Sequence, residues 1–175
     1  LATFALAEVI RRVDPQRVTI SAYGLREGLL YRQMSEEMRN LDPLIDTARH
    51  LEALHARAPG FGEALRAWLL PLFAGSPAAD LRLLRAACLL HDINWRVHPD
   101  YRAELCLESV TRANIAGIDH QERVFLGLAL LNRYSSSGAV DAGRYLPLLG
   151  PERIERAVIL GRRMRLGAML SGSAK

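Results

Sequence analysis

The sequence predicts a mainly α-helical protein, in which a helical bundle follows a short helix–strand–helix segment. Apolar residues recur at helical spacing through most of the chain after Asp42, and this periodicity is the main sequence signal of amphipathic helices. The stretch Leu81–Leu90 is apolar on nearly every side, which predicts a helix at the centre of the bundle. By contrast, Arg17–Ala22 alternates and has β-branched residues at its centre, which predicts a single strand.

The predicted strand lies between two predicted helices, Leu1–Val13 and Leu25–Met34. Helix, strand and helix in succession are typical of an α/β domain. A lone strand leaves its backbone N–H and C=O groups without partners, and the chain begins at Leu1 rather than at Met. We therefore expect a fragment whose sheet is completed by residues outside it, with Ser35–Leu41 as a hinge or a continued helix end.

The bundle itself is predicted to consist of amphipathic helices that are separated by proline, glycine and capping residues. Asp42, Asp80 and Asp119 are predicted N-caps, because a carboxylate there accepts hydrogen bonds from the free N–H groups of the first helical turn. The predicted helices span Leu44–Ala58, Gly62–Phe73, Leu81–Leu90, Pro99–Ile115, His120–Tyr134 and Pro151–Leu170.

Composition is ordinary for a globular domain, with 175 residues of which 50% are apolar and 24% charged. The net charge of +4 fits an anionic substrate or a nucleic acid, and equally a basic protein with neither partner. Aromatic residues make up only 6% and are not interleaved with basic ones, which argues against stacking on single-stranded nucleic acid. Because no apolar run could cross a membrane and no signal peptide is recognisable, we expect a cytoplasmic protein with Cys88 and Cys106 as reduced thiols.

A His91–Asp92 pair follows the predicted central helix at its buried end. A buried polar pair is costly unless it is hydrogen-bonded or binds a metal. In one interpretation Asp92 accepts hydrogen bonds from a loop or helix terminus, and His91 is a satisfied buried imidazole. In the other, the pair holds a divalent metal, as it does in the HD phosphohydrolase superfamily that it resembles. A metal needs further ligands, and the candidates are His50, His55 (on the inward stripe of its helix), His98 and Asp141.

Three segments resemble one family more closely. RVTISAYGLREG at Arg17–Gly28 resembles the motif that closes the actin-like catalytic module of the exopolyphosphatase and guanosine pentaphosphate phosphatase family. LLRAACLLHDINWRVHPDYR and GIDHQERVFLGLALLNRY resemble the HD-like helical domain at the C-terminus of that family. The resemblance implies that residues 1–38 are a remnant of the actin-like, ribonuclease H-like α/β domain, and that residues 39–175 are the HD-like all-helical domain.

The resemblance also implies a hydrolase that releases terminal phosphate from inorganic polyphosphate or guanosine pentaphosphate. In the family, Mg²⁺ and a catalytic glutamate belong to the actin-like half, and their motifs have no matching positions in this chain. We therefore assign no catalytic residue here and expect the fragment to be inactive without the N-terminal catalytic half. The parent enzyme is expected to be a cytoplasmic homodimer. The alternatives are an independent metal-dependent HD phosphohydrolase and a non-catalytic dimerisation domain.

Substrate contacts are predicted at two places. Arg26 follows a strand end and a glycine turn at a helix N-terminus, where free N–H groups favour phosphate. Arg162 and Arg163 lie on the arginine-rich last helix, where a basic track would suit a long polyanion. Each place also has a structural interpretation: Arg26 as an ion-pair partner, and the last-helix arginines as a solvated face.

Overall fold

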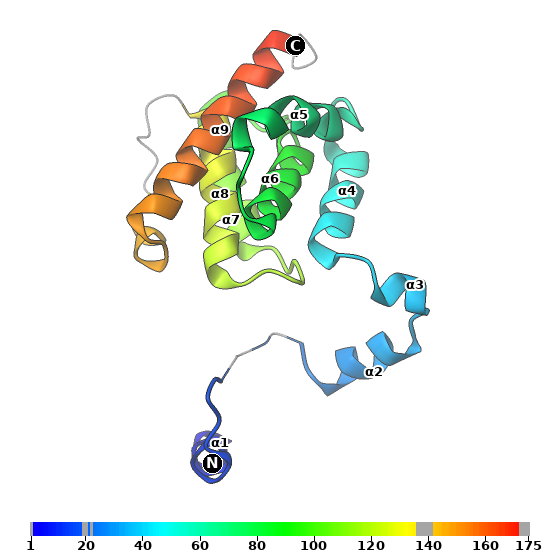
Figure 1. Cartoon of the computed structure of the whole chain (residues 1–175), viewed down its shortest axis with the longest axis vertical. Helices are drawn as coiled ribbons and strands as arrows, with labels where there is room; N and C mark the ends of the chain where they lie inside the picture. Colours follow the sequence, from blue (N-terminus) through cyan, green and yellow to red (C-terminus); the bar gives the residue numbers. More distant parts are fainter. Residues whose placement is uncertain (1, 19–20, 22, 136–141, 172–175) are drawn as a thin grey trace. The chain divides into compact units, whose positions relative to one another are not determined.

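The computed structural model describes residues 2–18, 21, 23–135 and 142–171, and every regular element within them is a helix (Figure 1). The mainly α-helical prediction is therefore confirmed. The chain separates into two units, Leu1–Asn40 and Leu41–Lys175, hereafter unit 1 and unit 2. Whether these units are an actin-like remnant and an HD-like domain stays a prediction.

The described part of unit 1 contains three helices, and none of them buries a described residue. Helix α2 begins after Gly24, whose N–H donates to the Glu27 carboxylate at 2.8 Å, so the side chain satisfies a backbone group at the helix start. Ser35 caps the third helix by accepting from the backbone N–H of Met38 at 3.3 Å. The three helices are α1 (Ala2–Val13), α2 (Leu25–Gln33) and α3 (Glu36–Arg39).

The strand predicted at Arg17–Ala22 is not present in the described residues of this segment. Arg17, Val18 and Ser21 have no strand structure, and residues 19, 20 and 22 lie outside the described residues. The physical reason is that a strand needs a neighbouring strand to pair its backbone N–H and C=O groups. The described part of unit 1 supplies only helices.

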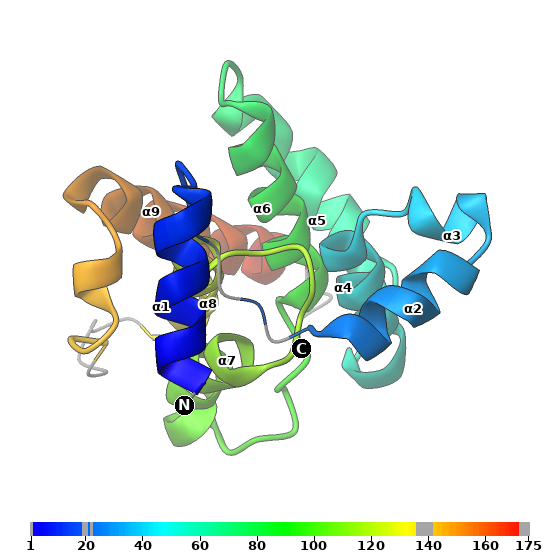
Figure 2. The ribbon, with the colours of Figure 1, turned by 90° about the horizontal axis from the view of Figure 1, so that it is seen from below.

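Unit 2 is a helical bundle in which α6 lies between α4 and α5 on one side and α8 on the other (Figures 1 and 2). Helix α8 packs in turn between α7 and α9. The helices are α4 (Pro43–His55), α5 (Phe61–Leu69), η1 (Leu70–Phe73), α6 (Ala78–Leu90), α7 (Pro99–Arg112), α8 (His120–Tyr134), η2 (Leu146–Leu148) and α9 (Pro151–Ser171).

The predicted central position of α6 is confirmed, because Leu83–Leu84 and Ala86–Leu90 are all buried. Burying one leucine side chain contributes roughly 1.5–3 kcal/mol. Helix α8 is equally central, since the continuous run Val124–Arg133 is buried. A Cβ added at Gly161 of α9 would lie 2.7 Å from Asn132 Cβ. Glycine at this position therefore lets α9 approach α8 closely.

Two of the three predicted N-caps are confirmed. Asp42 accepts from the backbone N–H of Leu44 at 3.0 Å, and Asp119 accepts from that of Glu122 at 2.8 Å. The prediction for Asp80 is wrong, because α6 begins earlier and Asp80 lies within its first turn. Its carboxylate instead pairs with Arg156 of α9 at 2.6 Å.

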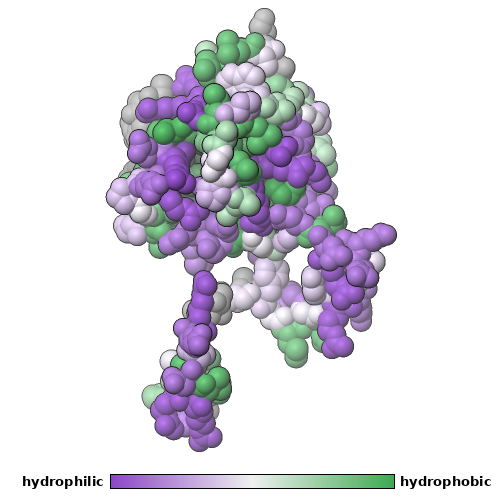
Figure 3. All heavy atoms as spheres, in the orientation of Figure 1, coloured by the Kyte–Doolittle hydropathy of each residue, from purple (hydrophilic) through white to green (hydrophobic). Residues whose placement is uncertain are grey.

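Hydrophobic side chains also reach the surface at the C-terminal end of α9 (Figure 3). Leu166, Met169 and Leu170 are exposed there, and Trp68 of α5 keeps 42% of its surface exposed. Among the described residues, no helix is long and apolar enough to span a membrane.

Candidate functional site

The His91–Asp92 pair lies at the C-terminal end of α6, and both residues are 3% exposed. Helix α6 ends at Leu90, and turns continue the chain to the start of α7. A helix end leaves its last carbonyls without intrahelical partners. The Nδ1 atom of His91 lies 2.9 Å from the carbonyl oxygen of Cys88, so the imidazole satisfies one of these carbonyls as a donor.

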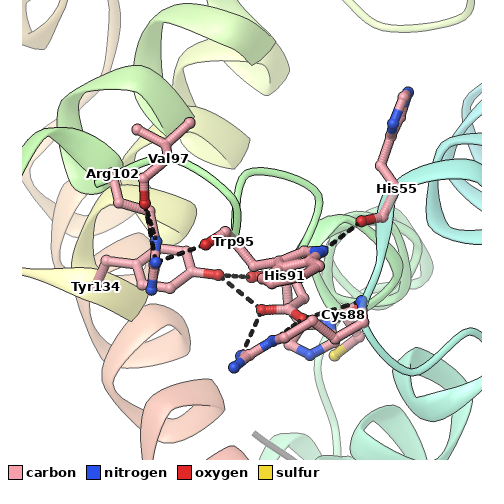
Figure 4. Close-up of polar contacts among 9 residues, drawn as sticks. His55, Cys88, His91, Trp95, Val97, Arg102 and Tyr134 are labelled. Carbon is pink, nitrogen blue, oxygen red and sulfur yellow. Dashed lines mark hydrogen bonds and ion pairs between the residues drawn. The ribbon is translucent and has the colours of Figure 1, made fainter. Parts of the chain in front are cut away.

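Asp92 is held by hydrogen bonds from two other parts of unit 2. The Arg57 guanidinium donates to both carboxylate oxygens, from Nε and Nη2 at 2.8 Å each, and the Arg57 backbone N–H adds a third bond at 3.3 Å. The Tyr134 hydroxyl donates to the same carboxylate at 3.0 Å and reaches the His91 carbonyl at 2.9 Å (Figure 4). Asp92 therefore joins the segment after α4 to the end of α8.

These contacts keep Asp92 ionised. Burial alone would raise the pKa of Asp92, but the hydrogen bonds from Arg57 and the neighbouring positive charge outweigh it, so the pKa lies below the usual value. The bidentate Arg57–Asp92 pair has the fork geometry that makes arginine–carboxylate contacts strong.

His91 is neutral at physiological pH. Burial, followed by the positive charge of Arg133, lowers the pKa of His91 to about 4. Its ring also packs against Phe61, with the ring centroids 5.3 Å apart. Since Nδ1 carries the proton toward the Cys88 carbonyl, Nε2 is the acceptor nitrogen of the imidazole.

The described residues do not assemble the ligand set that a divalent metal needs. His50, His55 and His98 are exposed, so the expectation that His55 points inward is wrong. The backbone carbonyl of His55 accepts from Trp95 Nε1 at 2.8 Å (Figure 4), so His55 contacts the segment after the pair through its backbone. No group of three or more His, Cys, Asp or Glu side chains suited to a metal occurs in the described part of the chain, and Asp141 lies outside it.

Arg57 occupies the place that a metal ion would need on Asp92. Its guanidinium takes both carboxylate oxygens and lies 5.6 Å from the centroid of the Trp95 ring. A hard divalent cation would need those same oxygens. The observed geometry therefore favours the structural interpretation of the pair, and we derive no chemical step through a metal here.

Sequence reasoning missed the arginines and the tyrosine around the pair. Arg102 donates to the carbonyls of Trp95 and Val97, at 2.6 and 2.9 Å from Nη2 (Figure 4), and its guanidinium lies 5.3 Å from the Tyr134 ring centroid. Arg133 is nearly buried beside the same ring, at 4.7 Å. One signal was available. A buried carboxylate requires a cation or several donors, and Arg57 lies in the last turn of the predicted helix Leu44–Ala58.

The predicted substrate-binding arginines differ in their contacts. Arg26, in unit 1, pairs with Glu27 at 3.1 Å while remaining largely exposed. On α9, Arg163 donates to the Leu72 carbonyl at 2.9 Å and lies over the Phe73 ring. Arg162 is exposed. The structure therefore places Arg163 in an internal contact and leaves Arg162 on the surface.

These features define the class of protein as an all-helical domain built around a central helix that ends in a buried His–Asp pair. A family model described as "Exopolyphosphatase, C-terminal" matches residues 44–175, which is most of the chain. The chain therefore belongs to the exopolyphosphatase family, in agreement with the resemblance of its sequence segments. No curated protein matches the chain closely.

Proposed function

We propose that the chain is the C-terminal part of an exopolyphosphatase-type phosphohydrolase, and that unit 2 adds contacts to a polyanionic substrate. The parent enzyme releases terminal phosphate from inorganic polyphosphate or guanosine pentaphosphate, using Mg²⁺ and a glutamate of the N-terminal half. The family match over residues 44–175 is the observation that carries this proposal.

The surface arginines of α9 support a role in polyanion binding. Arg162 and Arg165 have no hydrogen bond or ion pair with any described residue, and their spacing of three residues places them side by side on the helix. The other arginines of α9 already have contacts: Arg153 lies over Phe125, Arg156 pairs with Asp80 and Glu152, and Arg163 donates to the Leu72 carbonyl. Arg162 and Arg165 are therefore the α9 cations most available to phosphates.

Binding of long-chain polyphosphate to the 175-residue chain tests this role. Replacing Arg162 and Arg165 together by Ala should weaken binding about tenfold at low salt, and should reduce its salt dependence, because fewer counterions are released. Binding of tripolyphosphate should change less, since a short chain reaches fewer cations. Affinities are measured by fluorescence competition at several salt concentrations.

A matched control is available in unit 1. Arg11→Ala with Arg12→Ala removes the same positive charge from exposed side chains that pair with Glu8. This control should leave the polyphosphate affinity close to that of the wild type. Equal losses in the two double variants would mean that only net charge matters, and the assignment of Arg162 and Arg165 would be wrong.

The independent HD phosphohydrolase remains an alternative with a decisive assay. The proposal expects the 175-residue chain to release no phosphate from nucleotides, with or without Mn²⁺ or Co²⁺. Metal-dependent hydrolysis that His91→Ala abolishes would instead support that alternative.

One observation favours dimerisation as a second function of unit 2. A groove of about 320 Å³ between α5 and α9 is lined mainly by apolar side chains, among them Phe61, Trp68 and Leu170. Exposed apolar surface of this kind is common at protein interfaces. Sedimentation of the α9 double variant separates the two roles, because a change in oligomeric state without a change in polyphosphate affinity would favour dimerisation.

A further inference from the structure

Arg133 is a buried cation whose charge is not compensated by the residues of unit 2 that the structure describes. Its side chain belongs to the last turn of α8, and the residue is only 7% exposed. Its Nε atom is sealed from solvent without a hydrogen-bond partner. Its guanidinium makes no hydrogen bond or ion pair with a described residue, and it lies 4.7 Å from the centroid of the Tyr134 ring. Burying a charge in this way is costly unless an opposite charge compensates it.

The neighbouring arginines differ from Arg133 because their donors are used. Arg57 donates to the Asp92 carboxylate, and Arg102 donates to the carbonyls of Trp95 and Val97. Arg133 is thus the arginine of this cluster that keeps its hydrogen-bond donors free within the described structure.

The groups that face Arg133 do not neutralise it. Its electrostatic neighbours are Tyr134 on α8, Cys106 on α7, Asp92 after α6 and Arg57 after α4, and it also acts on His91. Burial raises the pKa of Tyr134 and raises that of Cys106 to about 11, so both are uncharged near neutral pH. Asp92 is the single anion among these neighbours, and its two oxygens already accept from Arg57 and Tyr134.

An excess of positive charge and a free guanidinium are the features of an oxyanion site. A guanidinium offers parallel N–H donors that match two oxygens of a phosphate group. The burial of Arg133 would strengthen such a contact, because fewer waters compete with the anion.

We infer that Arg133 binds one tetrahedral oxyanion, a phosphate group, at the end of α8 beside the His91–Asp92 pair. The bound anion compensates the buried guanidinium, with the Arg57–Asp92 pair and the Arg102 guanidinium fixing the Tyr134 ring against which Arg133 lies. The site uses none of the α9 arginines and does not depend on the role proposed for Arg162 and Arg165. Its phosphate group is either free orthophosphate or the end of a polyphosphate chain.

Equilibrium dialysis of the 175-residue chain against radiolabelled orthophosphate tests this inference. The wild type should bind one equivalent, and Arg133→Met should weaken binding at least tenfold while keeping the apolar stem of the side chain. Arg112→Met is the control, because Arg112 is an exposed arginine of α7 that pairs with Glu108. It should bind phosphate as the wild type does.

Thermal unfolding provides a second readout that does not depend on binding being tight. Saturating phosphate, at about ten times its dissociation constant, should raise the melting temperature of the wild type by about 3–6 °C over chloride at equal ionic strength. In phosphate-free buffer Arg133→Met should melt no lower than the wild type, since it removes an uncompensated charge. Should that variant fail to fold, Arg133→Lys serves instead, because lysine keeps the charge but lacks the paired donors.

The outcomes separate this site from the function proposed for α9. Failure of the wild type to bind orthophosphate, or equal binding by Arg133→Met, overturns the inference. In the Arg162→Ala, Arg165→Ala variant, labelled orthophosphate should still bind. If polyphosphate displaces the labelled orthophosphate, the ligand is the end of a polyphosphate chain. If the orthophosphate stays bound, the ligand is free phosphate. Either result supports the site.

Discussion

Units 1 and 2 share helical periodicity in sequence but differ completely in burial. In α1, Phe4 remains 83% exposed and Val9 55% exposed. In α6, Leu83 and Leu84 are at most 1% exposed. An amphipathic pattern thus predicts that a helix forms, whereas the stabilisation from its apolar face depends on the surface that covers it. Within the described residues, only unit 2 supplies such a surface.

The same contrast holds for carboxylates that contact arginine. Glu8 of α1 accepts from Arg11 and Arg12 at 2.7 Å, and its side chain remains 42% exposed. Asp92 makes comparably short bonds with Arg57, but its side chain is 4% exposed. Pairs with similar hydrogen-bond lengths therefore differ in the stability lost when one partner is removed. Water can solvate what remains of the exposed pair, but it cannot replace a partner lost from the buried one.

The largest expected effect follows from removing the buried carboxylate. Asp92→Ala removes the carboxylate that accepts from the Arg57 guanidinium and leaves the Tyr134 hydroxyl with the His91 carbonyl as its acceptor. It should lower the free energy of unfolding by about 3–5 kcal/mol. Glu8→Ala should cause no measurable change in the unfolding of unit 2. Urea denaturation followed by circular dichroism measures both. Similar curves for the two variants would show that the Arg57–Asp92 pair is as solvent-screened as the surface pair.

A smaller effect should be a pH dependence of the free energy of unfolding, which originates in unit 2. The pKa of His91 falls from about 6.5 to about 4 on folding, so between these values the unfolded chain binds a proton that the folded chain does not. Stability should therefore be complete above about pH 6.5 and decline as pH falls to about 4, by on the order of 3 kcal/mol. Asp92, whose pKa is lowered, adds a further loss at lower pH.

The pH dependence can be assigned by comparing two histidine variants. His91→Asn can still donate to the Cys88 carbonyl but does not titrate, so its stability should vary less between pH 4 and 6.5. His50→Asn, at an exposed position of α4, should keep the slope of the wild type. Urea midpoints at closely spaced pH values give these slopes. A wild-type slope in His91→Asn would assign the pH dependence to other groups.

Local features were predictable from the sequence, and distant contacts were not. The helices, the central position of α6 and the caps at Asp42 and Asp119 follow from patterns within a few residues. The partners of Asp92 are Arg57 and Tyr134, separated from it by 35 and 42 residues. Such contacts depend on how helices pack, so sequence reasoning predicted the burial of the pair but not what compensates it.

The three errors have related physical causes. The strand at Arg17–Ala22 was inferred from local propensity, which a sheet partner must support. His55 was predicted to point inward because it continues the buried stripe of α4. It is the last residue of that helix, and the core covers only the part before it. Asp80 was predicted as a cap because the helix was expected to begin at Leu81, whereas it begins at Ala78. Each local pattern was real, but its surroundings decided the outcome.

The smallest effects come from making the same substitution in both units. Gly161→Ala adds a Cβ in close contact with the Ala129 carbonyl and 2.7 Å from Asn132 Cβ, so α9 must shift away from α8. We expect a loss of about 1–3 kcal/mol. Gly28→Ala in α2 meets no atom within 4 Å and should raise the helical propensity of that segment by about 0.5–1 kcal/mol.

Glycine-to-alanine substitution is expected to have opposite effects in the two units, which is a strict test of the comparison between them. Near-ultraviolet circular dichroism during urea unfolding reports on unit 2, through its Trp68 and Trp95, and should show the loss in Gly161→Ala alone. Far-ultraviolet circular dichroism should show equal or greater helix content in Gly28→Ala. A loss of stability in Gly28→Ala comparable to that in Gly161→Ala would mean that α2 is packed as tightly as α9. In that case the distinction between an uncovered unit 1 and a covered unit 2 would fail.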